Sequence, residues 1–581
     1  MSSSPARTPS TPLALAPQLA RRVASQLARR ANVPTLGELR AAVRDGAASA
    51  RSGLGIVLRS GAWLDSRDFT RPGVATVMLR HGVGVGSAHA IHAAAHPDRI
   101  AVIDGPLRLS YEQLDERINQ TCHALLERCG ERRTPVLICM ENRWEYLTIW
   151  FALFRLGWPV VHASTSSTPD DLRYLMTHSG AQLAFASEQT ADVVHEVFGD
   201  QRAIVATAHR GARPNSFEGF LWGRASSFPG RRGEQSNNIV YTSGTTGRPK
   251  GTVRDFARMG PGEAIGILER LPVARVERHL IVSPLYHSAG QVFALLMTTL
   301  GATIHLLPDF EPDAVLETLS RHRITSVFLV PTMIARLLSL PAERFLAAPT
   351  PSLHLLISGA APFPQILRER AIRRFGADVV YDFYGASELG WVTLIGGREM
   401  LDRPGSLGRP LRGQELRAVR PDGSVCLPGE VGVIQVRTHS RMDGYLNDDD
   451  ATDEVFDSGW ISVEDTGYVD DDGYLTLVGR TRDMIIRGGV NIYPIEIEQV
   501  LARHPGVTDV AVFGVPDDVW GEQVAAAIVP AAADLDIATL DAYARQHLAR
   551  EKVPRAWHLV DQLPRNPTGK VLKRELRDRF A

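Results

Sequence analysis

A loop rich in glycine and hydroxyl side chains ends in a lysine near the middle of the chain. Residues 241–251 read Tyr-Thr-Ser-Gly-Thr-Thr-Gly-Arg-Pro-Lys-Gly, directly after the strand-like run Asn-Ile-Val. Glycines let backbone N–H groups close around an anion, hydroxyls donate further hydrogen bonds, and the ammonium of Lys250 neutralises phosphate charge. The pattern is not a Walker A loop, because Pro249 precedes the lysine and Gly251 follows it. We therefore predict a nucleotide-phosphate loop of another kind, with a plain surface loop as the alternative.

Lysine is rare in this chain, which makes each lysine informative. The sequence holds 60 arginines but only four lysines: Lys250, Lys552, Lys570 and Lys573. Arginine evidently serves wherever a generic positive charge suffices, whereas a compact ammonium on a flexible stem has uses that a planar guanidinium cannot fill. Lys250 already lies in a chemical context. Lys552 and Lys573 are interpreted as ordinary surface charges.

Length and composition place the chain among ordinary soluble proteins with more than one core. A chain of 581 residues is too long for a single hydrophobic core. The net charge of -1 gives no general attraction to nucleic acid. No apolar run is long enough for a membrane-spanning helix. The four cysteines form no C-x-x-C pair and are predicted to be buried thiols in a reducing cytoplasm: Cys122, Cys129, Cys139 and Cys426.

Strand-like and helix-like segments must position these chemical groups, and they alternate from about residue 86. Short apolar runs bounded by turn residues predict strands at Pro135–Met140, Pro159–His162, Asn238–Thr242, His279–Ser283, Ser326–Val330 and Leu353–Ser358. Helices are expected between them, for example over Glu141–Leu156 and Asp313–Arg321. This alternation predicts a layered α/β fold with largely parallel strands.

The chain divides into three predicted parts. Residues 1–85 form a basic extension, since the first 100 residues hold 13 Arg, no Lys and five acids. Its helical pattern over Leu13–Arg30 is read either as a helix packed on the main body or as a peripheral membrane contact. Residues 86–481 form a large domain, whose Gly-punctuated strands after about Leu411 indicate a small antiparallel or barrel-like part. Residues 482–581 form a small α+β domain.

The eleven-residue loop closely resembles the phosphate loop of the adenylate-forming superfamily, which comprises acyl-CoA synthetases, non-ribosomal peptide adenylation domains and firefly luciferases. Further stretches resemble the family's motifs in the same order, from about residue 86 to the end of the sequence: Ser283–Gly290, Ser358–Pro362, Asp382–Glu388, Gly459-Trp460, Asp483–Asn491 and Pro564–Leu572. The resemblance implies ATP, Mg²⁺ and CoA as cofactors, with a small-molecule carboxylic acid as the substrate.

The resemblance also assigns roles to individual residues. The ATP phosphates would be held by Thr242, Ser243, Gly244, Thr245, Thr246, Gly247 and Lys250, with Ser387 beside them and Mg²⁺ on Glu388. Adenine and ribose would be bound by Ser358, Gly359, Ala360, Asp382, Tyr384, Gly385, Asp465 and Arg480. An aromatic face suits a purine, and a carboxylate oxygen suits magnesium. Without the resemblance, Asp465 and Arg480 read as a surface ion pair.

Near the C-terminus the resemblance implies a moving part. Lys570 matches the family's catalytic lysine, Arg482 occupies the hinge, and Gly488 and Gly489 would line the path of the pantetheine arm. The implied first step joins the carboxylate to the α-phosphate and releases pyrophosphate; in the second step a thiol attacks the acyl-adenylate. One departure from the family pattern precedes Asp465, where Val-Glu-Asp replaces the usual Thr-Gly-Asp.

The sequence says least about the identity of the acid substrate. The mostly apolar stretch Gln291–Leu300 favours a hydrophobic acid, a medium- or long-chain fatty acid, although it reads equally as a core helix. His287 is interpreted as a gate of the acyl pocket or as a buried structural histidine, and Trp391 as a limit on chain length. The alternatives are an acyl-AMP ligase that loads a carrier protein, an aryl-acid CoA ligase and an inactive nucleotide-binding regulator. A homodimer is left open.

Overall fold

The computed structural model describes residues 73–74, 76–77, 87–206, 216–229, 237–242, 249–256, 261–273, 277–532, 535–565 and 570–580. All of them belong to one compact unit, Ile56–Ala581. The helix predicted over Leu13–Arg30 lies outside the described residues, so its packing or membrane contact stays a prediction.

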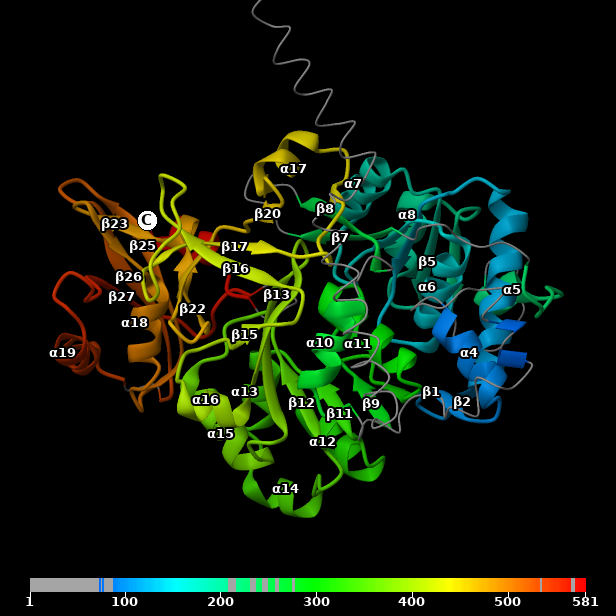
Figure 1. The fold of residues 1–581 in the computed structure, drawn as a ribbon, viewed down its shortest axis with the longest axis horizontal. Helices are drawn as coiled ribbons and strands as arrows, with labels where there is room; N and C mark the ends of the chain where they lie inside the picture. Colours follow the sequence, from blue (N-terminus) through cyan, green and yellow to red (C-terminus); the bar gives the residue numbers. More distant parts are fainter. Residues whose placement is uncertain are drawn as a thin grey trace, which may run out of the picture. The chain divides into compact units, whose positions relative to one another are not determined.

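The largest sheet has nine strands in the order β15-β14-β13-β12-β11-β9-β10-β1-β2 (Figure 1). The six strands from β1 to β13 run parallel, and β2, β14 and β15 add antiparallel edges. The strands are β1 (Ile100–Asp104), β2 (Leu107–Ser110), β9 (Arg278–Ile281), β10 (Thr303–Leu306), β11 (Ser326–Phe328), β12 (Leu355–Ser358), β13 (Val380–Ala386), β14 (Gly390–Gly396) and β15 (Arg409–Pro410).

A second sheet of seven strands has the order β18-β8-β7-β4-β3-β5-β6. Its strands from β7 to β6 run parallel, whereas β8 and β18 are antiparallel additions at one edge. They are β3 (Val136–Cys139), β4 (Val160–His162), β5 (Leu183–Ser187), β6 (Ala203–Ala206), β7 (Asn238–Thr242), β8 (Lys250–Arg254) and β18 (Gly444–Tyr445). The strands predicted from apolar runs are therefore present in these two sheets.

Two further sheets follow late in the chain. An antiparallel sheet contains β16 (Glu415–Val419), β17 (Gly432–Arg437), β19 (Phe456–Asp457), β20 (Trp460–Ile461), β21 (Asp465–Val469) and β22 (Leu475–Arg480). The last sheet contains β23 (Ile485–Arg487), β24 (Val490–Ile492), β25 (Val507–Asp517), β26 (Gly521–Pro530) and β27 (Ala556–Leu559). The helix α18 of this C-terminal part packs against β22, which joins the two sheets.

The helices surround these sheets and begin where the local sequence supplies caps. Ser110 and Gln113 form a capping box at the start of α5, and Thr168 with Asp171 does the same for α7. The helices are α4 (Ala88–Ala95), α5 (Tyr111–Cys129), α6 (Trp144–Leu156), α7 (Pro169–Ser179), α8 (Ala191–Phe198), α9 (Phe217–Leu221), α10 (Pro261–Arg270), α11 (Ser288–Thr299), α12 (Pro312–Arg321), α13 (Pro331–Leu337), α14 (Ala342–Ala347), α15 (Gln365–Phe375), α16 (Gly397–Asp402), α17 (Asp449–Val455), the 3₁₀ turn η6 (Thr481–Asp483), α18 (Pro494–Leu501), α19 (Ile537–His547) and α20 (Lys573–Phe580).

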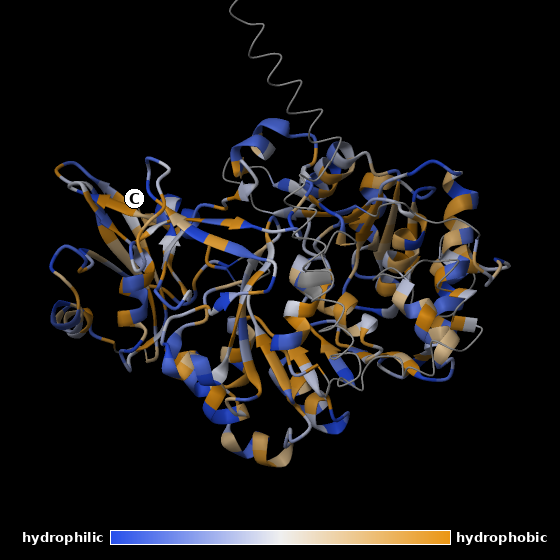
Figure 2. Ribbon diagram, viewed as in Figure 1, coloured by the Kyte–Doolittle hydropathy of each residue, from blue (hydrophilic) through white to orange (hydrophobic). Residues whose placement is uncertain are grey.

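Hydrophobic residues are concentrated in the strands of the large sheets, and outer helices such as α15 and α16 are largely hydrophilic (Figure 2). The prediction of a mixed α/β fold, with a large multi-sheet domain and a small C-terminal domain, is confirmed. The boundaries at residues 85 and 481 stay predictions. All four cysteines are free thiols, but the prediction that all are buried is wrong for two: Cys122 and Cys139 are buried, whereas Cys129 and Cys426 are partly exposed.

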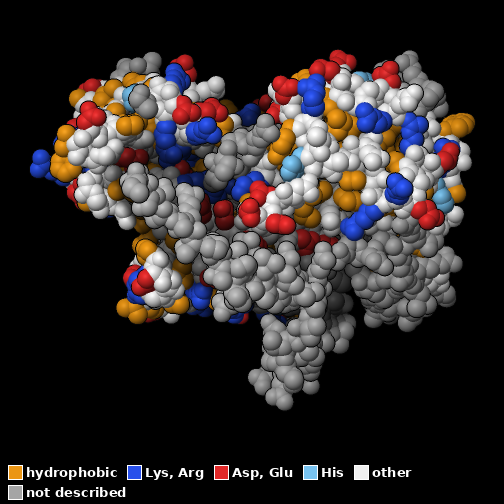
Figure 3. Space-filling model, turned by 90° about the horizontal axis from the view of Figure 1, so that it is seen from above, with side chains coloured by type: hydrophobic (Ala, Val, Ile, Leu, Met, Phe, Trp, Pro, Cys, Tyr) orange, Lys and Arg blue, Asp and Glu red, His pale blue; other side chains and the backbone are white. Residues whose placement is uncertain are grey.

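Two surface properties bear on the predicted partners. Basic and acidic side chains are intermixed over the described part of the face seen from above, in keeping with the net charge of -1 (Figure 3). In the part of the chain that the structure describes, no helix is long and apolar enough to cross a membrane.

Candidate active site

The predicted phosphate loop is the turn of a β-hairpin. Thr242, at the end of β7, pairs directly with Lys250, at the start of β8. Ser243, Gly244, Thr245, Thr246 and Gly247 lie outside the described residues, so their roles stay predictions. The hairpin nevertheless fixes both ends of the loop, because ladder hydrogen bonds hold the two strands in register.

Tyr445 connects Lys250 to Glu388. The ammonium of Lys250 lies 5.1 Å from the centre of the Tyr445 ring, a cation–π distance. The Tyr445 hydroxyl donates a hydrogen bond of 3.1 Å to Glu388 Oε1. Burial raises the pKa of Tyr445, with the Glu388 charge adding to the effect, so the hydroxyl stays a donor at neutral pH. No salt bridge to Glu388 is found among the described side chains, which leaves its carboxylate open to a cation.

The predicted adenine-binding residues lie at the ends of β12 and β13. A side chain at Gly359 is excluded, since its Cβ would lie 2.4 Å from the Phe383 ring. Gly385 is equally constrained, because a Cβ there would lie 2.1 Å from Gly390 O. Ala360 adopts a positive φ of 65°, a conformation rare for a residue with a side chain. These close contacts keep the adenine segment narrow and rigid.

Tyr384, Asp465 and Arg480 form one hydrogen-bonded group. The Tyr384 hydroxyl donates to Asp465 Oδ2 at 2.7 Å, and Arg480 Nε donates to Asp465 Oδ1 at 2.9 Å. The side chain of Asp465 is only 7% exposed, so the pair is not the surface ion pair that the sequence also allowed. The turn before it keeps its shape despite the missing glycine: Glu464 adopts a φ of 63°, in the region that glycine favours.

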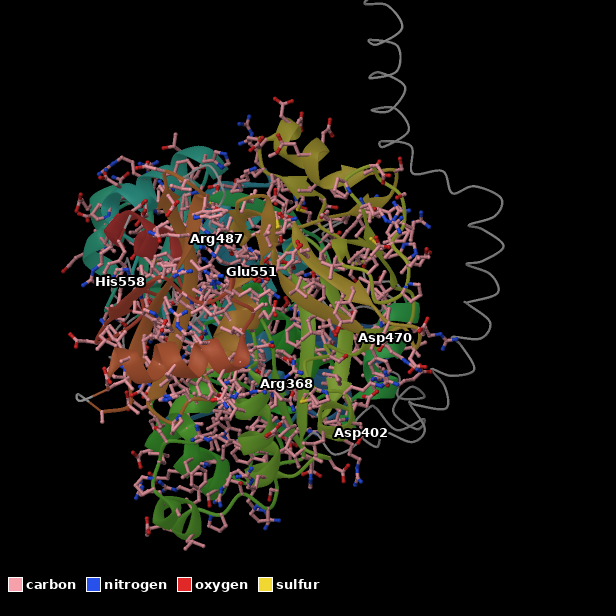
Figure 4. The ribbon with its side chains drawn as sticks, turned by 90° about the vertical axis from the view of Figure 1, so that its left-hand side faces the viewer. Arg368, Asp402, Asp470, Arg487, Glu551 and His558 are labelled. Carbon is pink, nitrogen blue, oxygen red and sulfur yellow. The ribbon has the colours of Figure 1, made fainter. Side chains whose placement is uncertain are left out.

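Asp382 has a partner that sequence reasoning did not name. Arg368 Nη2 donates to its carboxylate at 2.6 Å, and both side chains are 2% exposed. Burial raises the pKa of Asp382, and the Arg368 charge opposes this effect. Figure 4 labels Arg368, which also donates to Ser406 O at 2.6 Å. The carboxylate thus braces β13, and its predicted contact with the adenine amino group stays a prediction.

The C-terminal part presents the predicted hinge and thiol path. Arg482 lies exposed in η6. Gly488 and Gly489 form the turn of the β23–β24 hairpin with φ values of 57° and 83°, and both are exposed. Beside them, Arg487 Nη1 donates to Glu551 O at 3.1 Å; Figure 4 labels both residues.

Lys570 interacts electrostatically with residues of the large domain. Its pKa is lowered to about 8, first by burial and next by the Arg480 charge, while Asp465 and Glu388 oppose the shift. Solvent still reaches the side chain, which weakens the effect of burial. The pKa of His287 is lowered to about 4 by burial and then by Lys570. The charge of Lys570 therefore acts on residues of both the predicted nucleotide site and the predicted acid site.

His287 and Ser387 complete the centre of the site. His287 is the residue before α11, and its Nε2 is buried without a hydrogen-bond partner among the described residues. Ser387 Oγ lies 3.0 Å from Ser288 Oγ, in the first turn of α11. A neutral imidazole with an unused nitrogen suits either of the two predicted roles, gate or structural residue.

Comparison with known proteins places the chain. The family model described as AMP-binding enzyme matches residues 90–446, and the AMP-binding enzyme C-terminal domain matches residues 496–570. The chain belongs to the AMP-binding enzymes. The predicted resemblance is therefore confirmed for this enzyme, and its relatives are AMP-forming acid–thiol ligases.

Three relatives illustrate the similarity of this AMP-binding enzyme. It is 31% identical to a 2-succinylbenzoate–CoA ligase of Bacillus licheniformis, over 83% of this chain and 97% of that protein. It is 34% identical to a feruloyl-CoA synthase of an Amycolatopsis species, over 86% and 99%. The structure of o-succinylbenzoate CoA synthetase from Bacillus subtilis, in complex with an acyl-adenylate intermediate, is 28% identical with a TM-score of 0.73, over 84% and 98%.

Proposed function

We propose that this enzyme is an ATP-dependent ligase that joins a carboxylic acid to CoA through an acyl-adenylate. The observation that carries the proposal is that the charge of Lys570 acts on His287 as well as on the Asp465–Arg480 pair. One cation therefore acts both on the predicted acid pocket and on the predicted nucleotide site. Relatives named as CoA ligases and a CoA synthase support the acceptor.

The first step follows from these positions. A carboxylate oxygen attacks the α-phosphorus of ATP, the bond to the bridging oxygen breaks, and pyrophosphate leaves with its electron pair. The enzyme supplies position and positive charge, since no covalent intermediate on a side chain is required. Lys570 would hold the attacking carboxylate against the α-phosphate, while Lys250 would hold the outer phosphates.

Magnesium fits beside Glu388. Magnesium commonly takes one or two carboxylates and completes its shell with phosphate and water. Glu388 offers one such carboxylate, held in place by Tyr445. Among the described residues no cluster of three metal-ligating side chains exists, which argues for an ion shared with the substrate phosphates.

The second step needs a thiol to reach the acyl carbon. Sulfur attacks the carbonyl, the bond to the phosphate oxygen breaks, and AMP leaves. We propose that Arg482 is the hinge about which Lys570 withdraws and the Gly488–Gly489 turn approaches. The exposure of Arg482, Gly488 and Gly489 supports this motion, since solvent-facing residues can move with little repacking.

We infer the class of acid from the lining of the pocket rather than from the apolar stretch that suggested a fatty acid. Most of α11 is core: Val292, Phe293, Ala294 and Leu295 are all buried in the main hydrophobic cluster. Its residues that line the pocket are polar, Ser288 and Gln291. The apolar stretch therefore gives no separate support to a medium- or long-chain fatty acid; we propose an aryl or functionalised acid, with the fatty acid as the second candidate.

ATP–pyrophosphate exchange over a panel of acids, repeated with CoA and with mass detection of the thioester, tests the proposal. We expect exchange that depends on an acid and a thioester that depends on CoA. Exchange without a CoA product would favour the carrier-protein ligase. The complete absence of exchange with fatty, aryl and dicarboxylic acids would favour the inactive regulator and overturn the proposal.

A further inference from the structure

A narrow polar pocket lies between α11 and the β7–β8 hairpin. Its polar lining consists of Asn238, Thr252, Arg254, Ser288, Gln291 and Ser387. Ser288 and Ser387 join α11 to the segment predicted beside the phosphates. The pocket therefore adjoins the segment predicted beside the phosphates, and its polar side chains are candidates for contact with the tail of an acid.

The hairpin explains why arginine lies in this pocket. Side chains alternate along a strand, so Lys250, Thr252 and Arg254 share one face of β8. The register pairs Lys250 with Thr242 and Arg254 with Asn238. The same face of one strand thus carries the predicted phosphate lysine at one end and Arg254 at the other.

Two buried hydrogen-bond donors in this pocket lack partners among the described residues. Gln291 is fully buried with Nε2 unpaired, and Thr252 is 2% exposed with Oγ1 unpaired. Arg254 lines the same pocket, is 7% exposed, and no hydrogen bond or ion pair to its guanidinium occurs among the described residues. An unpaired buried donor is costly, so two together beside a cation indicate a ligand that accepts hydrogen bonds.

The neighbouring amide shows that the pocket is ordered. Asn238 Nδ2 donates to Gln291 Oε1 at 2.8 Å, and its own oxygen accepts from Trp150 Nε1 at 2.9 Å. Gln291 is thereby fixed with its oxygen occupied and its NH₂ group free to donate. The unpaired groups are therefore donors by arrangement rather than by the choice of amide orientation.

The charge of Arg254 is supported from nearby without direct contact. The carboxylates of Glu263, Glu388 and Asp443 favour its charged form, although burial lowers its pKa to about 10. Glu263 is itself satisfied by neutral donors, including Gln414 Nε2 at 3.0 Å and Thr438 Oγ1 at 3.0 Å. Arg254 also lies 5.1 Å from the centre of the Phe256 ring. The guanidinium remains a cation whose fork is unoccupied by any described carboxylate.

We propose that Arg254, with Gln291 and Thr252, binds an oxygen acceptor at the far end of the acid, foremost a second carboxylate. This inference rests on the proposed function, because it names the substrate class of the same site. A guanidinium matches a carboxylate through two parallel hydrogen bonds. A site built to hydrogen-bond a substrate group rejects the analogue that lacks it, by a larger factor than an apolar pocket achieves.

Matched acid pairs of equal length test the proposal: hexanoate with adipate, octanoate with suberate, and 3-(4-methylphenyl)propanoate with 3-(4-carboxyphenyl)propanoate. Binding in the presence of ATP is measured by calorimetry on Lys570→Ala, and kcat/KM for pyrophosphate exchange on the Lys570 enzyme. We expect at least a tenfold preference for the dicarboxylic acid over its monocarboxylic partner in one or more pairs. Arg254→Leu should abolish that preference, and Arg254→Lys should keep part of it.

Thr252→Val is the second variant, because it preserves side-chain volume and removes only the hydroxyl. It should reduce the preference severalfold. Thr121→Val is the matched control: Thr121 is buried in α5 and donates to Arg117 O at 2.8 Å, away from the pocket. It should leave the ratio within each pair unchanged.

The outcomes separate this inference from the proposed function. Tighter binding of the dicarboxylic acids, lost in Arg254→Leu, supports the role of Arg254 even when exchange fails. Equal or weaker binding of those acids at every length overturns the inference, and does so even when fatty acids are activated well. An equal loss of both members of each pair in Arg254→Leu and Thr252→Val likewise overturns it, since Arg254 would then be structural.

Discussion

The Tyr384 hydroxyl lies 2.7 Å from Asp465 Oδ2 and joins two sheets, because Tyr384 belongs to β13 and Asp465 to β21. Tyr384→Phe keeps the aromatic face but leaves Arg480 as the remaining partner of the Asp465 carboxylate. Loss of this hydrogen bond costs about 1–2 kcal/mol. We expect the KM for ATP to rise roughly five- to thirtyfold with a smaller change in kcat. Tyr468→Phe, the same change later in β21, serves as the control; equal KM values for both variants would contradict the assignment.

Lys570→Ala should separate the two half-reactions. Removing the ammonium should lower acid-dependent pyrophosphate exchange at least 100-fold, in the range found when one charge-stabilising group is deleted. Thioester formation from supplied acyl-AMP should stay within about threefold of the unmodified enzyme, because Lys570 has withdrawn in that step. Lys573→Ala is a close control, since Lys573 pairs with Glu498 at 2.7 Å. Equal loss of both half-reactions in Lys570→Ala would show that Lys570 is not specific to adenylation.

The pKa of Lys570 predicts an alkaline limit on adenylate formation. Its pKa is lowered from 10.5 to about 8, by burial first and the Arg480 charge second, so the ammonium is lost as the pH rises through about 8. The kcat/KM for pyrophosphate exchange, which reports the free enzyme, should fall tenfold for each pH unit above this value. In Lys570→Arg the limb should disappear while the overall rate is lower, because the guanidinium stays charged. A limb at the same pH in this variant would assign the titration to another group.

Trp391 is predicted to limit the length of the acid, and its packing sets how the test must be designed. It is 6% exposed and stacks on Phe383 at 4.8 Å between ring centres. Trp391→Ala should therefore cost about 3–5 kcal/mol of stability, measured by urea unfolding. It should also shift the profile of exchange rates toward longer acids, with Trp391→Phe intermediate in both respects. A loss of stability with an unchanged profile would make Trp391 a core residue alone.

Much of the fold could be predicted from local pattern. Runs such as Pro135–Met140 and Asn238–Thr242 are short, apolar and bounded by turn residues, so they mark strands without knowledge of their partners. The Gly-punctuated pattern after about Leu411 likewise predicts strands, and Gly432–Arg437 forms β17 there. The helix expected over Glu141–Leu156 begins instead at Trp144, after Arg143 in an extended conformation.

The parts of the site that sequence reasoning missed depend on contacts between distant segments. Arg368 pairs with Asp382 because α15 packs against β13. The spacing of the two residues in the sequence does not predict a buried ion pair. Tyr445 reaches Glu388 through the pairing of β18 with β8. Arg254 follows Lys250 and Thr252 on one face of β8. The sequence could have indicated this only if the register of the hairpin had been known.

The β7–β8 hairpin fixes the distance between Lys250 and Arg254. Four residues along a strand span about 13 Å, and the ladder hydrogen bonds keep that span from stretching. Lys250 and Arg254 mark its two ends on one face. Exchanging Arg254 for another residue therefore changes one end of the strand while the pairing of Lys250 with Thr242 is kept. A slip of one residue in register, by contrast, would turn the side chains of Lys250 and Arg254 to the opposite face together. Selectivity for the acid and binding of the nucleotide would then be lost at the same time.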